Sequence, residues 1–373
     1  MCVPSECRGE AEGVTEPTSS LSKDLSTLFG PGRDGAIVAR YFGFGEHTGG
    51  TLRKVAREVG LTHERVRQIV ISRALMLRHK RIETPHLDRA IGFIASALPA
   101  PVSQLERELK SAGIVPIQFR LEELVRAVEF LGQSIPFTIT RIRGVGIAHL
   151  RKDAPLDVIV QMARKLVRRQ GAATISEVAD WMVRSRLGEN DRALISSVLA
   201  AQRHFSWLDC SQGWFWFSDV DPNRLASRIM KIVSIANPVK LSELKDGILR
   251  DYKMESDLPP DHVFLEFCRQ ACRLQPSAVG IFSPEELDCR YLLSESELYI
   301  AELLKTNGGL MSSHELSLRW TNHWTQKATL HQILCSSPII VKHSPGMYGL
   351  VGIPALGEAQ HTGSEPMMYE TWL

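Results

Sequence analysis

Apolar residues recur at three- and four-residue intervals along much of the chain, the spacing that gives a helix one buried face. The pattern is clearest between residues 51 and 70. There the first predicted helix places these side chains on one face: Leu52, Val55, Ala56 and Val59. The second helix has an inner stripe of Val66, Ile69 and Val70. Gly60 suits the turn between them and Thr62 suits an N-cap, so this segment predicts a helix-turn-helix.

The C-terminal two thirds contains an internal repeat. Three short segments, each following a helix and a break, place a glutamate at positions 177, 243 and 315. Residues 208–217 align without a gap to residues 341–350, and both stretches predict a strand, a Gly-containing turn and a strand. Each unit therefore has the order helix, short extended piece, helix, helix, hairpin. This order resembles the winged-helix modules of the RNA polymerase delta subunit and related HARE-type domains.

These patterns predict a mainly α fold with small β-hairpins, in which a helix-turn-helix domain is followed by tandem winged-helix domains. We expect a disordered arm over 1–32, because Ser, Thr, Pro, Gly and Glu dominate it. The helix-turn-helix domain spans 33–82, and 83–155 is either a linker or a divergent winged-helix unit. The winged-helix repeats are predicted at 156–220, 221–290 and 291–354, with a flexible tail at 355–373.

Positive charge is concentrated in the helix-turn-helix segment. The 373 residues have a net charge of only +2, whereas residues 51–81 contain nine cationic and two acidic side chains. Near the start of the second helix, side chains suited to hydrogen-bonding base edges predict the base-reading set: His63, Glu64, Arg67 and Gln68. The surrounding cations predict phosphate contacts: Arg53, Lys54, Arg57, Arg65, Arg73 and Arg78. The alternative for this segment is a helical hairpin with a merely solvated basic face.

The same segment resembles region 4 of the bacterial sigma-70 family. The likeness lies in Thr51-Leu52, Val55-Ala56, Val59-Gly60 and above all residues 62–69, Thr-His-Glu-Arg-Val-Arg-Gln-Ile. Residues 72–79 and 37–43 also resemble the helices that follow and precede the family's motif. The resemblance implies reading of a promoter −35 element and docking on RNA polymerase, with Glu64, Arg67 and Gln68 at base-reading positions. His63 stands where the family usually has Arg and Val70 where it usually has Glu, and no stretch before residue 33 resembles region 2.

The third helix of a winged-helix module decides whether it meets DNA or protein. These helices are expected near 192–205, 261–273 and 327–336, and they have few outward cations. The scarcity of positive charge favours protein contacts or scaffolding over a second DNA surface. Five tryptophans near the hairpins and helix faces are predicted to lie in cores rather than to stack on bases: Trp207, Trp214, Trp216, Trp320 and Trp324.

The sequence offers no recognisable catalytic, metal or cofactor site. The seven cysteines include no CxxC pair, and neither HExxH nor GxSxG occurs. Cys268 and Cys272 lie on a helical pattern that predicts buried thiols. We therefore expect a non-enzyme without cofactors, free of membrane segments or a signal peptide, in the cytoplasm at the bacterial nucleoid.

Two functions remain open from the sequence. The first is a sequence-specific DNA-binding transcription factor, whose partners are double-stranded DNA, RNA polymerase core and other proteins bound through the winged helices. The alternative is a non-catalytic adaptor whose modules bind polymerase or other proteins rather than DNA. Exposure of Glu64, Arg67 and Gln68 would favour the first, and a large apolar patch on the same helix would favour the second.

Overall fold

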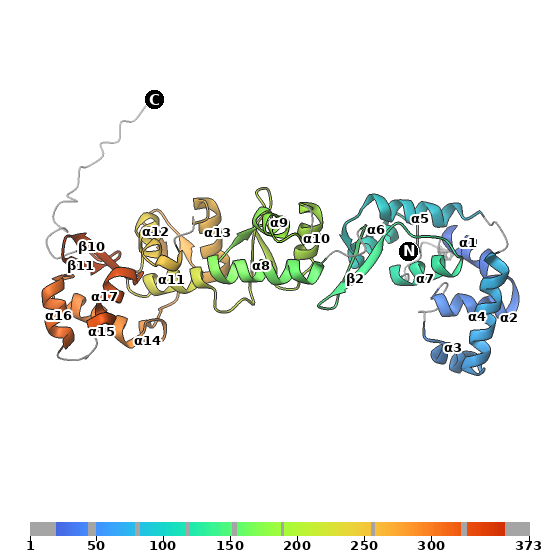
Figure 1. Ribbon diagram of the computed structural model, residues 1–373, viewed down its shortest axis with the longest axis horizontal. Coiled ribbons are helices and arrows are strands. Elements are labelled where there is room, and N and C mark those ends of the chain that lie inside the picture. Colours follow the sequence, from blue (N-terminus) through green and yellow to red (C-terminus); the bar gives the residue numbers. More distant parts are fainter. Residues whose placement is uncertain are drawn as a thin grey trace, which may run out of the picture. The chain divides into compact units, whose positions relative to one another are not determined.

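The computed structural model describes residues 20–43, 50–78, 83–115, 120–150, 155–187, 190–254, 258–321 and 327–354. Within these ranges the chain is mainly helical and carries small antiparallel sheets (Figure 1). The expected class of mainly α with small β elements is thus confirmed. The chain divides into two compact units, which are described separately: unit 1 holds residues 1–157 and 193–202, and unit 2 holds residues 158–192 and 203–373.

Unit 1 begins with four helices: α1 (Ser20–Phe29), α2 (Gly32–Phe42), α3 (Leu52–Val59) and α4 (His63–Arg78). The turn predicted at Gly60 and the N-cap predicted at Thr62 are confirmed, and Thr51 is a further N-cap. The Thr51 hydroxyl accepts a hydrogen bond from the Lys54 backbone N–H at the start of α3. Gly60 ends that helix with a φ of 68°, a left-handed conformation that glycine adopts without steric cost. Thr62 Oγ1 accepts from the Arg65 backbone N–H and so caps α4.

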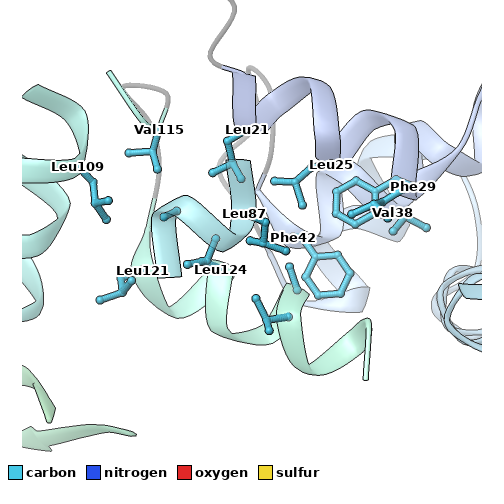
Figure 2. Packing of buried hydrophobic residues seen from close by; sticks show 14 of the residues in the cluster. Leu21, Leu25, Phe29, Val38, Phe42, Leu87, Leu109, Val115, Leu121 and Leu124 are labelled. Atoms are coloured by element: carbon cyan, nitrogen blue, oxygen red, sulfur yellow. The ribbon is translucent and has the colours of Figure 1, made fainter. Parts of the chain in front are cut away.

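Helix α1 corrects the prediction of a disordered arm over 1–32, of which residues 1–19 lie outside the described part of the chain. Its apolar side chains are buried against α2 and α5 (Pro85–Ser96): Leu21, Leu25, Leu28 and Phe29. Figure 2 shows three of them, Leu21, Leu25 and Phe29, within the cluster of buried side chains. Their spacing is that of an amphipathic helix. The sequence did not predict this helix, because its few apolar residues lie among many polar ones.

The rest of unit 1 consists of α5, β1 (Ala100–Pro101), α6 (Val102–Ser111), α7 (Leu121–Phe130), β2 (Thr138–Ile142) and β3 (Val145–His149). The antiparallel sheet has the order β1-β3-β2. Residues 83–155, expected to be either a linker or a further repeat unit, therefore follow the order of the repeat. The ring of Phe42 in α2 lies 5.0 Å from that of Phe130 in α7, and both helices contribute to one core (Figure 2). The segments predicted at 33–82 and 83–155 thus pack together within unit 1.

The same order of elements follows three more times. We name the four copies A (85–149), B (156–217), C (224–282) and D (295–350). Copy B contains α8 (Leu156–Gln170), β4 (Ala173–Thr174), α9 (Ile175–Arg184), α10 (Arg192–Ala200), β5 (Phe205–Asp209) and β6 (Trp214–Phe217). Copy C contains α11 (Arg224–Val233), α12 (Leu241–Leu249), η1 (Tyr252–Met254), α13 (Asp261–Cys272), β7 (Gln275–Pro276) and β8 (Ile281–Phe282).

Copy D follows the short α14 (Cys289–Leu292). It contains α15 (Glu295–Thr306), β9 (Leu310–Ser312), α16 (Ser313–Thr321), α17 (Lys327–Ser336), β10 (Ile340–Ser344) and β11 (Met347–Leu350). In copies A, B and D the first strand pairs antiparallel with the last: β1 with β3, β4 with β6, and β9 with β11. In copy C the first strand is reduced to a single bridge between Val239 and Ile281. The repeat in the sequence therefore corresponds to a repeated order of helices and strands in the structure.

The repeated glutamates mark the start of the second helix in copies B, C and D. Glu177 and Thr174 form a reciprocal capping box at α9, each side chain bonding the other's backbone N–H. Glu315 and Ser312 make the same pair of bonds at α16. In copy C the residue three positions earlier is Lys240, and its ammonium lies 3.9 Å from Glu243. A helix-capping requirement thus accounts for the motif in copies B and D.

Candidate nucleic-acid interface

Helix α4 buries one side and exposes the other. The predicted inner stripe of Val66, Ile69 and Val70 is buried in the core of unit 1. On the outer side, His63, Arg67 and Gln68 are exposed, and Glu64 is half-exposed. The four residues predicted to read bases therefore lie together on the first two turns of α4. A helix that enters the major groove meets base edges with this end.

Two of these four side chains are joined by a bidentate ion pair. Arg67 donates from Nε to Glu64 Oε2 at 2.9 Å and from a terminal nitrogen to Glu64 Oε1 at 2.6 Å. Their side chains nevertheless remain 49% and 45% exposed. The hydrogen bond from Arg67 lowers the pKa of the Glu64 carboxyl below its ordinary value. At neutral pH the surface thus presents a carboxylate that accepts and a guanidinium that donates, side by side.

The predicted phosphate contacts divide into two groups. Arg53, Lys54 and Arg57 on α3 and Arg65 on α4 are exposed. Arg73 is different: its Nε donates to the Leu28 carbonyl at 3.0 Å, and its guanidinium packs against Gly30. This half-buried cation satisfies a carbonyl at the C-terminal end of α1, where positive charge is favourable. Arg73 therefore has a structural role that the sequence did not predict, and its predicted contact with phosphate stays a prediction. The side chain of Arg78 lies outside the described part of the structure.

The second half of the outer face of α4 is apolar. Ile71, Leu75 and Met76 are 43%, 51% and 52% exposed. Together with Arg67, Gln68 and Ser72 they line an open depression on this helix. We call Ile71, Leu75 and Met76 the apolar strip. Its members are additional to the inner stripe, so apolar side chains lie on both sides of α4 between residues 66 and 77. The sequence contains this signal, which the prediction of a single apolar stripe missed.

Two polar side chains on the third helix of copy C, Gln270 and His262, contact the hairpin of copy B. Trp216 in the hairpin of copy B donates from its indole nitrogen to Gln270 Oε1 at 2.8 Å. Gln270 Nε2 in turn donates to the Trp207 carbonyl at 3.1 Å. At the other end of α13, His262 Nε2 lies 2.9 Å from Asp209 Oδ2. Contacts with Ser211 and His262 hold the pKa of the Asp209 carboxyl at about 2. Copy B therefore contacts this helix near both of its ends, while the His262 side chain stays 56% exposed.

Two of the predicted core tryptophans, Trp216 and Trp320, are buried. Trp207 and Trp214 are half-buried, and Trp324 lies outside the described residues. The prediction of buried thiols on α13 is confirmed: burial raises the pKa of both cysteines, that of Cys272 to about 12. Thiols with such pKa values stay protonated at neutral pH and are poor nucleophiles.

The described residues contain neither a metal-binding cluster nor a membrane-spanning helix. They contain no group of three or more His, Cys, Asp or Glu side chains placed to hold a metal ion. None of the helices in the described ranges combines the length and the apolar composition that crossing a membrane requires. Comparison with known proteins found no matching family model, no matching curated protein and no matching solved structure. The assignment of function therefore rests on the residues themselves.

Proposed function

We propose that this chain is a sequence-specific DNA-binding transcription factor whose α3–α4 hairpin reads a promoter element of the −35 type. One observation carries the proposal: Glu64, Arg67 and Gln68 share the exposed face at the N-terminal end of a capped helix whose opposite face is buried. Exposed cations on α3 and α4 flank this face. Hydrogen-bonding groups surrounded by cations are what a major-groove reader requires.

In this proposal the three side chains have separate roles. Arg67 donates to O6 and N7 of a guanine, Gln68 makes a bidentate pair with an adenine, and Glu64 accepts from the amino group of a cytosine. The ion pair orients the Arg67 guanidinium before DNA arrives, which reduces the entropy lost on binding. Phosphate contacts come from Arg53, Lys54, Arg57 and Arg65, which fix the position of the helix without reading sequence.

The apolar strip supports a protein contact on the same helix. Exposed Ile71, Leu75 and Met76 would gain stability by burial against a partner. The resemblance to sigma-70 region 4 makes RNA polymerase core the expected partner. The strip also favours a second candidate function, an adaptor in which α4 grips polymerase or another protein and does not bind DNA.

The four repeated copies are proposed to be winged-helix modules. Their element order and the pairing of the first strand with the last support this assignment. In copy C, Gln270 and His262 on the third helix bond to the hairpin of copy B. These contacts and the few outward cations favour scaffolding and protein contacts, rather than a second major-groove reader, for the third helices of copies B to D.

The test is fluorescence anisotropy of the full chain on a duplex bearing a −35-like hexamer and on a scrambled duplex, at low and physiological salt. Arg67→Ala should weaken binding to the hexamer about five- to 150-fold and abolish the preference for it. Arg89→Ala is the matched control, because Arg89 is an exposed arginine of unit 1 on α5, outside the α3–α4 hairpin.

Equal binding to both duplexes would contradict sequence reading. Absence of binding to either duplex would favour the adaptor. In that case Leu75→Glu should abolish capture of purified RNA polymerase core while Arg67→Ala leaves the capture intact.

A further inference from the structure

A second cationic site lies in unit 2, between the first two helices of copy B. α8 and α9 enclose a pocket of about 380 Å³. Its lining includes three cations, Lys165, Arg169 and Arg184, together with Trp181, Gln170 and Glu177. None of these residues belongs to the α3–α4 hairpin or to a third helix.

The cations of α8 fall into two rows with different environments. Arg164 pairs with Asp219 at 2.8 Å and lies over the ring of Phe217, and Arg168 donates to the Asp221 carbonyl. These two stabilise the fold of unit 2. Lys165 and Arg169, one residue further along, line the pocket and make no hydrogen bond or ion pair with any described residue. The second row is therefore available to a ligand.

The pocket has more positive than negative charge. Arg184 uses Nε to donate to the Asp180 carbonyl at 3.3 Å. The carboxylate of the lining, Glu177, already accepts hydrogen bonds from the Thr174 backbone and hydroxyl. Three cations thus face one carboxylate that is engaged in capping α9. This arrangement complements an anionic ligand.

The pocket also has a flat ring on its wall, and a buried acceptor without a partner belongs to one of its lining residues. Trp181 is half-exposed on its wall. Gln170 Oε1 is buried and has no hydrogen-bond partner among the described residues. The repeat does not require an aromatic side chain here: four residues after the repeated glutamate, copy C has Gly247 and copy D has Arg319. The ring is therefore specific to copy B.

We infer that this pocket binds an unpaired nucleotide of single-stranded DNA. The base stacks on Trp181, and the adjoining phosphates contact Lys165, Arg169 and Arg184. The bases of a duplex cannot stack on the Trp181 ring, because they remain stacked on one another. The choice of DNA as the nucleic acid rests on the proposed function.

The experiment measures anisotropy of a labelled thymidine oligomer of about 12 nucleotides, within the site sizes typical of such proteins, added to the full chain. Trp181→Ala should weaken binding about five- to 150-fold, whereas Trp181→Phe should retain most of the affinity. Lys165→Ala should also weaken binding and reduce the slope of log affinity against log salt by about 0.7.

The matched control is Lys305→Ala, which removes an exposed helical lysine of unit 2 on α15, outside the pocket lining. It should leave the affinity unchanged, and circular dichroism should show that every variant is folded. Unchanged binding by Trp181→Ala would overturn the inference, and so would equal loss in Lys165→Ala and Lys305→Ala. A loss of duplex binding in Trp181→Ala as large as its loss of oligomer binding would overturn the inference as well, and so would tighter binding of a uridine oligomer of equal length.

The two proposals can fail independently. Arg67→Ala should weaken duplex binding without changing binding of the thymidine oligomer, and Trp181→Ala should weaken binding of the oligomer. If the chain shows no preference for the −35-like hexamer while oligomer binding still depends on Trp181, the pocket assignment stands. If the oligomer fails to bind while the hexamer is preferred, only the pocket assignment is lost.

Discussion

Helices α4 and α13 have comparable local patterns and opposite surroundings. Both bury one apolar face, and both carry polar side chains on the other. On α4 the polar residues at the N-terminal end remain exposed, whereas on α13 Gln270 and His262 bond to the hairpin of copy B. Amphipathic pattern alone does not therefore identify a reading helix. The neighbours of the polar face decide whether its hydrogen-bonding groups are available to DNA.

Unit 2 joins its copies through buried polar contacts as well as apolar ones. Lys231 of copy C donates to Glu297 Oε2 of copy D at 2.5 Å. Ser337 donates to the other carboxylate oxygen at 2.8 Å. Such contacts suit a scaffold, while the exposed end of α4 suits binding. We therefore expect variants at the junctions of unit 2 to change the free energy of unfolding. Variants at the exposed end of α4 should instead change the affinity for duplex DNA.

The largest effect is expected at the junction of copies C and D. Glu297→Ala leaves the Lys231 ammonium largely buried without its partner and should destabilise unit 2 by about 3–5 kcal/mol. Urea unfolding measures this loss, and Glu295→Ala, an exposed acid on the same helix, is the control. Duplex affinity measured below the unfolding transition should not change. A loss of duplex affinity in the folded variant would contradict the expectation that this junction of unit 2 stabilises the fold without affecting DNA binding by α4.

A smaller effect is expected from Arg57 and Arg73, which the sequence predicted alike to contact phosphate. Arg73→Ala removes the bond to the Leu28 carbonyl and should lower the free energy of unfolding by about 1–3 kcal/mol. Arg57→Ala should leave stability unchanged and reduce the salt slope of duplex binding by about 1. Denaturation and anisotropy of both variants test this division. The same salt-slope change in both would restore Arg73 to the phosphate-contacting set.

The smallest effect concerns acid stability. Burial alone would raise the pKa of Glu297, but hydrogen bonds from Lys231, Ser294 and Ser337 outweigh it and hold the pKa below the ordinary value of 4.5. A carboxyl with a lowered folded-state pKa stabilises the fold above its unfolded pKa, and this contribution is lost as pH falls through the folded value. Unit 2 should therefore weaken below about pH 4.5. In Glu297→Gln the free energy of unfolding should depend less on pH below about 4.5. If the pH dependence is unchanged, Glu297 is not the cause of the acid destabilisation.

The sequence was sufficient where the interactions are local. Thr62 bonds a backbone N–H three residues away, as predicted, and Gly60 adopts a left-handed conformation because it has no Cβ. The repeated glutamates were visible for the same reason, since a capping box spans four residues. Helix periodicity also identified Val66, Ile69 and Val70 as the inner stripe of α4. Local chemistry of this kind can be read from spacing alone.

Tertiary structure decided which polar groups are available. Arg73 became a structural residue because α1 packs beside α4, and no local pattern reveals that long-range contact. Trp181 lines a pocket because α8 places Lys165 and Arg169 opposite α9. The amino-acid sequence thus determined the helices, their caps and the repeated order. Packing between distant segments decided which side chains stabilise the fold and which remain exposed, because burial and hydrogen-bond partners depend on neighbours far apart in the chain.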